Sequence, residues 1–136
     1  MKRLLLILYM AFMSSLAGNM TPGKVLYIAS YEPIQPYEQL WRAVCHVETK
    51  NNPLAYNRKE QATGIAQIRP IRLKDYNERT RSHLKITEMY DPKKSKTVFL
   101  FYAERCKYFD LERIAKSWNG RGKKTNKYWK EVKKHL

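Results

Sequence analysis

The sequence has few acidic residues for its length. It carries 12 Asp and Glu against 27 Lys and Arg, which gives a formal net charge of +15. An excess of this size implies an anionic partner or surface, such as nucleic acid, an acidic membrane face or an anionic wall polymer. Charge alone does not choose among them. The length of 136 residues, 43% of them hydrophobic, suits one domain with one modest core.

Cysteine is also scarce, with only Cys45 and Cys106 in the chain. Both lie in predicted helices, on or beside an apolar stripe. Two cysteines with no His pair at ligand spacing exclude a zinc site. A single disulfide and two free thiols both remain open.

Long apolar runs are limited to Leu4–Ala17, which follows Lys2 and Arg3. The pattern, with the small residues Ser15 and Ala17 at the positions that a signal peptidase reads, is typical of a secretory signal peptide over residues 1–17. The run is short for a membrane span, although an uncleaved anchor is the alternative. Its removal would leave a charge of +13, with no stable membrane span. We therefore expect an exported protein of the periplasm or cell envelope, and no nucleic-acid partner.

The next segment, residues 18–36, contains three of the six prolines. Pro22, Pro33 and Pro36 argue against regular structure, although Val25–Ile28 could form a short strand. We interpret residues 18–36 as an extended lead-in without chemistry. The remaining residues, 37–136, form the expected domain.

Hydrophobic periodicity predicts a mainly α (α+β) fold for this domain. A loop and a short helix with Leu73 and Tyr76 inward are expected between residues 68 and 80, and a small irregular or β element near residues 60–65. The other predicted helices lie around Leu40–Glu48, from Asp91 to about Phe109, at Leu111–Trp118 and at Thr125–His135.

Glu48 is an unusual residue for the first of these helices. It lies on the apolar stripe with Trp41 and Val44, and Asn51-Asn52-Pro53 indicates that the helix ends just after it. Burial and the negative end of the helix dipole both raise the pKa of a carboxyl group. A carboxylic acid still protonated near neutrality suits a general acid. A helix-end glutamate without a role is the alternative.

Most glycosidases use a second carboxyl group. Glu60, Asp75, Asp91 and Asp110 are the candidates within the domain, and of these four Glu60 lies nearest to Glu48 along the chain. A charged loop residue of this kind is more often simply solvated.

Three sequence elements carry a family resemblance. They are Glu48-Thr49, Gly64-Ile65-Ala66-Gln67-Ile68 and Ser117-Trp118-Asn119-Gly120. In this order and spacing, the block from about residue 37 to 136 resembles the lytic transglycosylases of the SLT type, in the lysozyme-like superfamily. In that family the corresponding elements read Glu-Ser, Gly-Leu-Met-Gln-Ile and Ala-Tyr-Asn-Gly.

The resemblance implies the chemistry. One glutamate, here Glu48, would protonate the glycosidic oxygen between N-acetylmuramic acid (MurNAc) and N-acetylglucosamine (GlcNAc) in peptidoglycan. It would then act as a base on the C6 hydroxyl to close a 1,6-anhydro ring. This mechanism requires no second carboxylate and neither a metal nor an organic cofactor.

The resemblance also implies the substrate-binding residues. Thr49 replaces the family serine, and its hydroxyl would bond near Glu48 or satisfy its own helix. Gly64 would allow close approach of sugar and backbone. Gln67 would bond the MurNAc region, and Asn119 would orient the sugar or the backbone.

Trp118 departs from the family, which often has a tyrosine there whose hydroxyl can contact the catalytic carboxylate. An indole cannot replace that hydroxyl, so Trp118 would stack on a sugar or belong to the core. Tyr102 and Tyr128 are the candidates to supply the missing hydroxyl, and Tyr102 is also expected to bind substrate.

Two other functions compete with a peptidoglycan lytic transglycosylase. One is a hydrolytic lysozyme of the same fold, and the other is an exported basic protein that binds the wall without catalysis. Small relatives of the family often open the wall for conjugation, secretion systems or phage entry, and this chain is similar in size.

Overall fold

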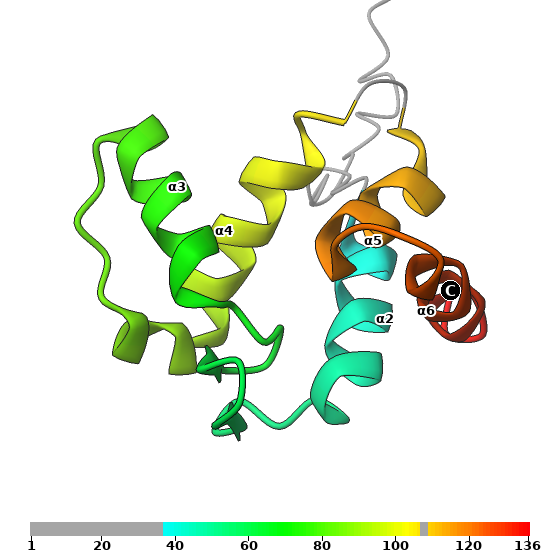
Figure 1. The fold of residues 1–136 in the computed structure, drawn as a ribbon, viewed down its shortest axis with the longest axis horizontal. Helices are drawn as coiled ribbons and strands as arrows, with labels where there is room; N and C mark the ends of the chain where they lie inside the picture. Colours follow the sequence, from blue (N-terminus) through cyan, green and yellow to red (C-terminus); the bar gives the residue numbers. More distant parts are fainter. Residues whose placement is uncertain (1–36, 107–108) are drawn as a thin grey trace, which may run out of the picture. The chain divides into compact units, whose positions relative to one another are not determined.

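The protein is described by a computed structural model, which describes residues 37–106 and 109–136. The described residues belong to one compact unit, which spans Gln35–Leu136. Its helices are α2 (Glu38–Thr49), α3 (Pro70–Thr80), the 3-10 helix η1 (Ile86–Tyr90), α4 (Pro92–Ala103), α5 (Leu111–Asn119) and α6 (Lys124–Lys133). The strands are β1 (Tyr56–Asn57) and β2 (Ala62–Thr63) (Figure 1). The prediction of a mainly α fold with a small β element is confirmed. The possible strand at Val25–Ile28 lies outside the described residues.

Short-range signals in the sequence explain where several helices begin. The Asp91 side chain accepts a hydrogen bond from Lys93 N at 2.8 Å and so caps α4, with Pro92 as the first helical residue. The Asp110 side chain accepts from Arg113 N at 2.9 Å and caps α5 in the same way. Pro70 opens α3.

The two short strands pair antiparallel, with Tyr56 opposite Thr63 and Asn57 opposite Ala62. The connecting turn is held by the Asn57 side chain, which accepts from Lys59 N at 3.0 Å and from Glu60 N at 3.3 Å. The predicted β element at residues 60–65 contains β2, whereas β1 precedes it.

The core lies between α2, α4 and α5. Phe99 of α4 is fully buried, and its ring centroid is 5.3 Å from that of Trp41 and 5.1 Å from that of Trp118. Leu73 and Tyr76 of α3 are buried, as predicted. Helix α6 packs against α5 and α2 (Figure 1).

The prediction that the helix beginning at Asp91 runs to about Phe109 is wrong, because α4 ends at Ala103. The chain turns there, with Cys106 N donating to Ala103 O at 3.0 Å. No Gly or Pro marks this end, so the apolar pattern alone extends the helix too far. Phe109 adopts a left-handed backbone with φ 49° just before the extended Asp110 cap.

Both cysteines are free: Cys45 is buried in α2, and Cys106 is half-buried beyond the end of α4 rather than inside a helix. Burial raises the pKa of the Cys45 thiol to about 12, which leaves it unreactive as a nucleophile. Among the described residues, no helix is long and apolar enough to cross a membrane.

Candidate functional site

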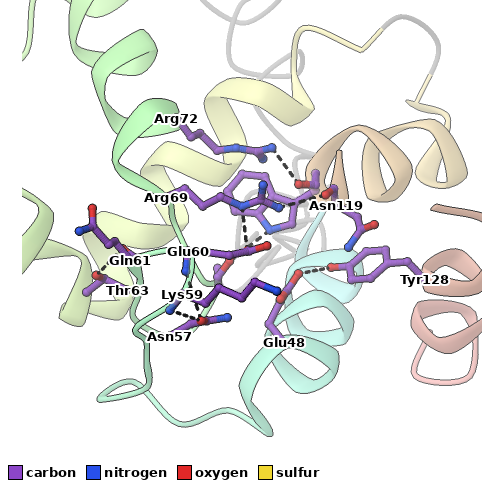
Figure 2. A network of polar contacts seen from close by, with 12 residues as sticks. Glu48, Asn57, Lys59, Glu60, Gln61, Thr63, Arg69, Arg72, Asn119 and Tyr128 are labelled. Carbon is purple, nitrogen blue, oxygen red and sulfur yellow. Dashed lines mark hydrogen bonds and ion pairs between the residues drawn. The ribbon is translucent and has the colours of Figure 1, made fainter. Parts of the chain in front are cut away.

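Glu48 lies in the last turn of α2, with Thr49 as the final helical residue. Its side chain is half-buried, and its Oε1 accepts a hydrogen bond from the Tyr128 hydroxyl at 2.8 Å (Figure 2). Burial raises the pKa of Glu48, as the sequence predicted. The Tyr128 hydrogen bond and the charges of Arg69 and Arg72 act in the opposite direction. The carboxyl group is therefore held protonated more readily than a surface glutamate.

Tyr128 comes from α6, 80 residues after Glu48. Burial and the neighbouring Glu48 charge raise the pKa of its hydroxyl, so that it remains a hydrogen-bond donor. Of the two tyrosines considered from sequence, Tyr128 is the one that contacts Glu48.

Thr49 joins the end of α2 to the glycine-containing segment that follows the strands. Its hydroxyl lies 2.8 Å from Ile65 O and 3.2 Å from Cys45 O of its own helix. The hydroxyl proton is thus used within the protein, and it fixes the loop beside Glu48.

Gly64 has φ +80°, a conformation that favours glycine. A Cβ on Gly64 would lie 1.8 Å from Met89 O. At Gly64 the close approach is therefore between two stretches of backbone, that of Gly64 and that of Met89. Met89 O also accepts a hydrogen bond from the buried Ser95 hydroxyl at 2.7 Å, which fixes its position.

Gln67 also has a left-handed backbone, with φ 52°. Its Nε2 donates to Gly64 O at 3.1 Å and lies 3.5 Å from Ala55 O. The side chain thus bridges the segments on either side of the strands. Its Oε1 accepts no hydrogen bond from any residue in the described ranges and has acceptor capacity left.

Trp118 belongs to the core, one of the two roles considered from sequence, with 5% of its surface exposed. Its Nε1 donates to Ala66 O at 3.2 Å, so α5 is tied to the same segment that Thr49 holds. Asn119 follows at the end of α5, and its side-chain amide extends toward the Glu48–Tyr128 pair in Figure 2.

Two arginines at the start of α3 were missed by the sequence reasoning. Arg69 donates to Asn119 O at 3.2 Å, and Arg72 donates to Trp118 O at 2.8 Å and to Ser117 O at 3.3 Å (Figure 2). The Arg72 guanidinium also lies 4.1 Å from the centroid of the Trp118 ring.

These cations meet the carbonyl groups that end α5, where positive charge is favourable. The sequence gives little indication of these contacts. The arginines stand on either side of Pro70, and nothing there shows that their partners lie about 50 residues further along the chain.

Tyr102 is placed apart from Glu48. Its hydroxyl donates to Asp75 Oδ2 at 2.7 Å or to Arg72 O at 2.9 Å, and burial raises its pKa. It lines a hollow of about 490 Å³ with Ile71, Arg72, Asp75, Ser117 and Arg121. A second hollow, of about 440 Å³, shares Ser117 and Arg121 with the first and extends along α5 to Asp110.

Glu60, the nearest in sequence of the four candidate second carboxylates, forms an ion pair with Arg69 at 3.2 Å. About half of its side chain is exposed, and its negative charge also raises the pKa of Glu48. The site thus contains one half-buried acid with a directed hydrogen-bond donor, flanked by two cations. Such a group can give up a proton and then be stabilised as an anion.

Within residues 37–106 and 109–136, no cluster of three His, Cys, Asp or Glu could hold a metal ion.

One comparison with known proteins identifies a family for this chain. A comparison with protein families matches residues 28–135 to the family described as Transglycosylase SLT domain. No curated protein and no solved structure matches the chain. Members of the matched family are transglycosylases that cleave glycosidic bonds. The family implies peptidoglycan as the substrate and the cell envelope as the place of action. Because the match covers most of the sequence, this chain belongs to the SLT-type lytic transglycosylase family of the lysozyme-like superfamily.

Proposed function

We propose that this protein is a peptidoglycan lytic transglycosylase that cleaves the β-1,4 bond from MurNAc to GlcNAc and leaves 1,6-anhydroMurNAc ends. The observation that carries the proposal is the half-buried Glu48, whose pKa is raised and whose Oε1 accepts a hydrogen bond from Tyr128. Family membership supplies the substrate class.

In the first step, protonated Glu48 donates its proton to the glycosidic oxygen as the bond to the MurNAc C1 breaks. The new carboxylate keeps the Tyr128 hydrogen bond, and Arg69 and Arg72 stabilise its charge. These groups favour the anion that forms during the reaction, while burial keeps the resting group protonated. The substrate's own acetamido group stabilises the developing cation.

In the second step, the Glu48 carboxylate takes the proton from the C6 hydroxyl of the same sugar. The C6 oxygen then bonds to C1, which closes the anhydro ring and returns Glu48 to its protonated form. Because the nucleophile belongs to the substrate, proximity lowers the barrier, by up to ~7–11 kcal/mol in well-oriented cases. One acid that serves both steps explains why Glu60 is free to pair with Arg69.

The substrate contacts remain part of the proposal. The free Oε1 of Gln67 is a suitable acceptor for a sugar N–H or O–H, and the Asn119 amide can bond a sugar above Glu48. Thr49 and Gly64 fix the loop that carries Gln67. Tyr102 would bind substrate from the wall of the hollow that it shares with Arg72.

We also propose that residues 1–17 are a signal peptide and residues 18–36 a lead-in, so that the domain acts in the periplasm or envelope. A secretion, conjugation or phage machinery that needs the wall opened locally is the proposed partner.

The proposal is tested by the clearing of purified sacculi. Glu48→Gln keeps the shape of the side chain but cannot donate the proton, so clearing is expected to fall by at least ~100-fold, within the range that general acid catalysis supplies. Glu60→Gln is the matched control and is expected to retain most of the activity. Absence of clearing by wild type and Glu48→Gln alike would leave only a protein that binds the wall, whereas equal clearing by both would show that Glu48 is not the acid.

A further inference from the structure

Helix α6 has two distinct faces. Thr125 and Val132 are buried, and Tyr128 and Trp129 pack partly buried against the core. On the opposite side, four lysines recur at i, i+4, i+7 and i+11, and all are exposed. We call Lys123, Lys127, Lys130 and Lys134 the lysine stripe. At 1.5 Å per residue the stripe is about 16 Å long.

The charge of this stripe is largely uncompensated. Residues 121–136 contain seven Lys or Arg but only one acidic residue, Glu131. Glu131 pairs with Lys134 at 2.9 Å. Lys123, Lys127 and Lys130 form no ion pair with any residue that the structure describes. Like charges along one helix face destabilise the helix slightly, which offsets the stabilisation that Lys130 and Lys134 gain at the C-terminal end of α6.

We propose that the lysine stripe is a docking face for an anionic phospholipid surface. Exposed Lys124 and Lys133 flank the stripe and broaden it into an array of positive charge. Clusters of four to eight basic residues on an amphipathic helix are typical of proteins that bind anionic lipid headgroups. The ammonium group is a compact, hydrated point charge, which suits a diffuse phosphate surface better than bidentate recognition of one group.

The shape of the face favours a surface over a linear polymer. The outer side of a helix is convex, and neither of the two hollows is lined by a stripe lysine. A single glycan or nucleic-acid strand is usually held in a groove, and single-stranded nucleic acid also requires aromatic rings for stacking. The aromatic residues of α6 face the core instead.

The inner face of α6 contacts Glu48 and its outer face carries the lysine stripe, so docking through the stripe sets the orientation of the site. Tyr128 holds Glu48 from the inner face, so a protein docked through the lysine stripe turns Glu48 away from the lipid. This orientation would suit the proposed activity on the wall, but lipid binding itself does not depend on that activity.

The test is binding of the full chain to vesicles of phosphatidylcholine, with and without phosphatidylglycerol. Removal of one lysine charge near an anionic surface weakens binding by about fivefold. The combined variant Lys123→Gln, Lys127→Gln, Lys130→Gln and Lys134→Gln is therefore expected to bind anionic vesicles at least ~100-fold more weakly at low salt. The matched control removes four charges elsewhere, through Lys74→Gln, Arg81→Gln, Lys85→Gln and Lys93→Gln, and is expected to lose less than ~10-fold.

All three proteins share the apolar run at residues 4–17, so its contribution is the same in each comparison. Circular dichroism and the clearing of sacculi show that each variant is folded. Equal weakening in the two variants would overturn the proposal, because net charge and not the stripe would then control binding. It would also be overturned if wild type bound both vesicle types equally, or bound wall polymer or nucleic acid in preference to anionic vesicles.

Discussion

At the scale of single residues, Glu48 combines two requirements that oppose each other. Burial raises its pKa and keeps the proton in place, whereas Tyr128, Arg69 and Arg72 lower the pKa and stabilise the anion. A fully exposed glutamate would lose its proton before the substrate arrived. A buried glutamate without these partners would release its proton only reluctantly.

The raised pKa predicts that Glu48 destabilises the fold above mildly acidic pH. The folded protein binds this proton more tightly than the unfolded chain, so stability falls as pH rises from the ordinary glutamate value through the raised value of Glu48. Glu48→Gln removes the charge and is expected to raise the free energy of unfolding at pH 8 by about 0.5–2 kcal/mol. Urea unfolding of both proteins at pH 4 and pH 8 measures the difference, which should shrink at pH 4. A difference that is the same at both pH values would contradict the assignment.

Tyr128→Phe removes the hydroxyl that donates to Glu48 Oε1 while keeping the ring. Because this hydrogen bond lowers the pKa of Glu48, its loss raises the pKa further. The alkaline decline of activity, which follows deprotonation of the acid, is therefore expected to move to higher pH. The maximal rate should fall by ~10- to 100-fold, as expected for a lost hydrogen bond to a charged group.

A pH profile of sacculus clearing measures both effects of Tyr128→Phe. Tyr90→Phe, in η1, is the control and should leave the profile unchanged. A drop in rate with no movement of the alkaline limb would show that Tyr128 acts only in packing.

At the scale of elements, the segment from Gly64 to Ile68 connects the β element to η1 and to α5. Gly64→Ala would place a Cβ 1.8 Å from Met89 O, at a φ of +80°. We expect a loss of at least ~3 kcal/mol in the free energy of unfolding, because backbone on both sides must move. Gly122→Ala is a matched control: its φ is +91°, but no heavy atom lies within 4 Å of the added Cβ. It should lose only ~1 kcal/mol from backbone strain. Similar losses in urea unfolding would contradict the close contact.

The elements that the sequence predicted best are those with local signals. Asp91-Pro92 marks the start of α4, and the apolar spacing in α5 and α6 places both helices within about two residues. The end of α4 was predicted too late, because a turn at Ala103 carries no Gly or Pro. The raised pKa of Glu48 follows from its place on an apolar stripe, which the sequence shows.

The partners of those residues could not be predicted with the same certainty. Tyr128 was one of two tyrosines, and only the packing of α6 against α2 brings it to Glu48. Arg69 and Arg72 were not identified, because their acceptors are main-chain carbonyls that end another helix. Backbone acceptors leave no trace in residue identity.

At the scale of the whole molecule, the site depends on segments far apart in the chain. Glu48 comes from α2 and Tyr128 from α6, while Arg69 and Arg72 tie α3 to the end of α5. A single helical unit thus provides the acid, its donor and the cations around it. The large positive charge lies mainly outside this site, and part of it forms the lysine stripe on the outer side of α6.

The central claim is that Glu48 serves first as acid and then as base on the same sugar. The mass of the muropeptides released from purified sacculi tests it most directly. Ring closure without water leaves 1,6-anhydroMurNAc ends, which are lighter by one water than the reducing ends that hydrolysis leaves. We predict anhydro ends from wild type and neither product from Glu48→Gln. Reducing ends from wild type would contradict the account and identify a lysozyme of the same fold.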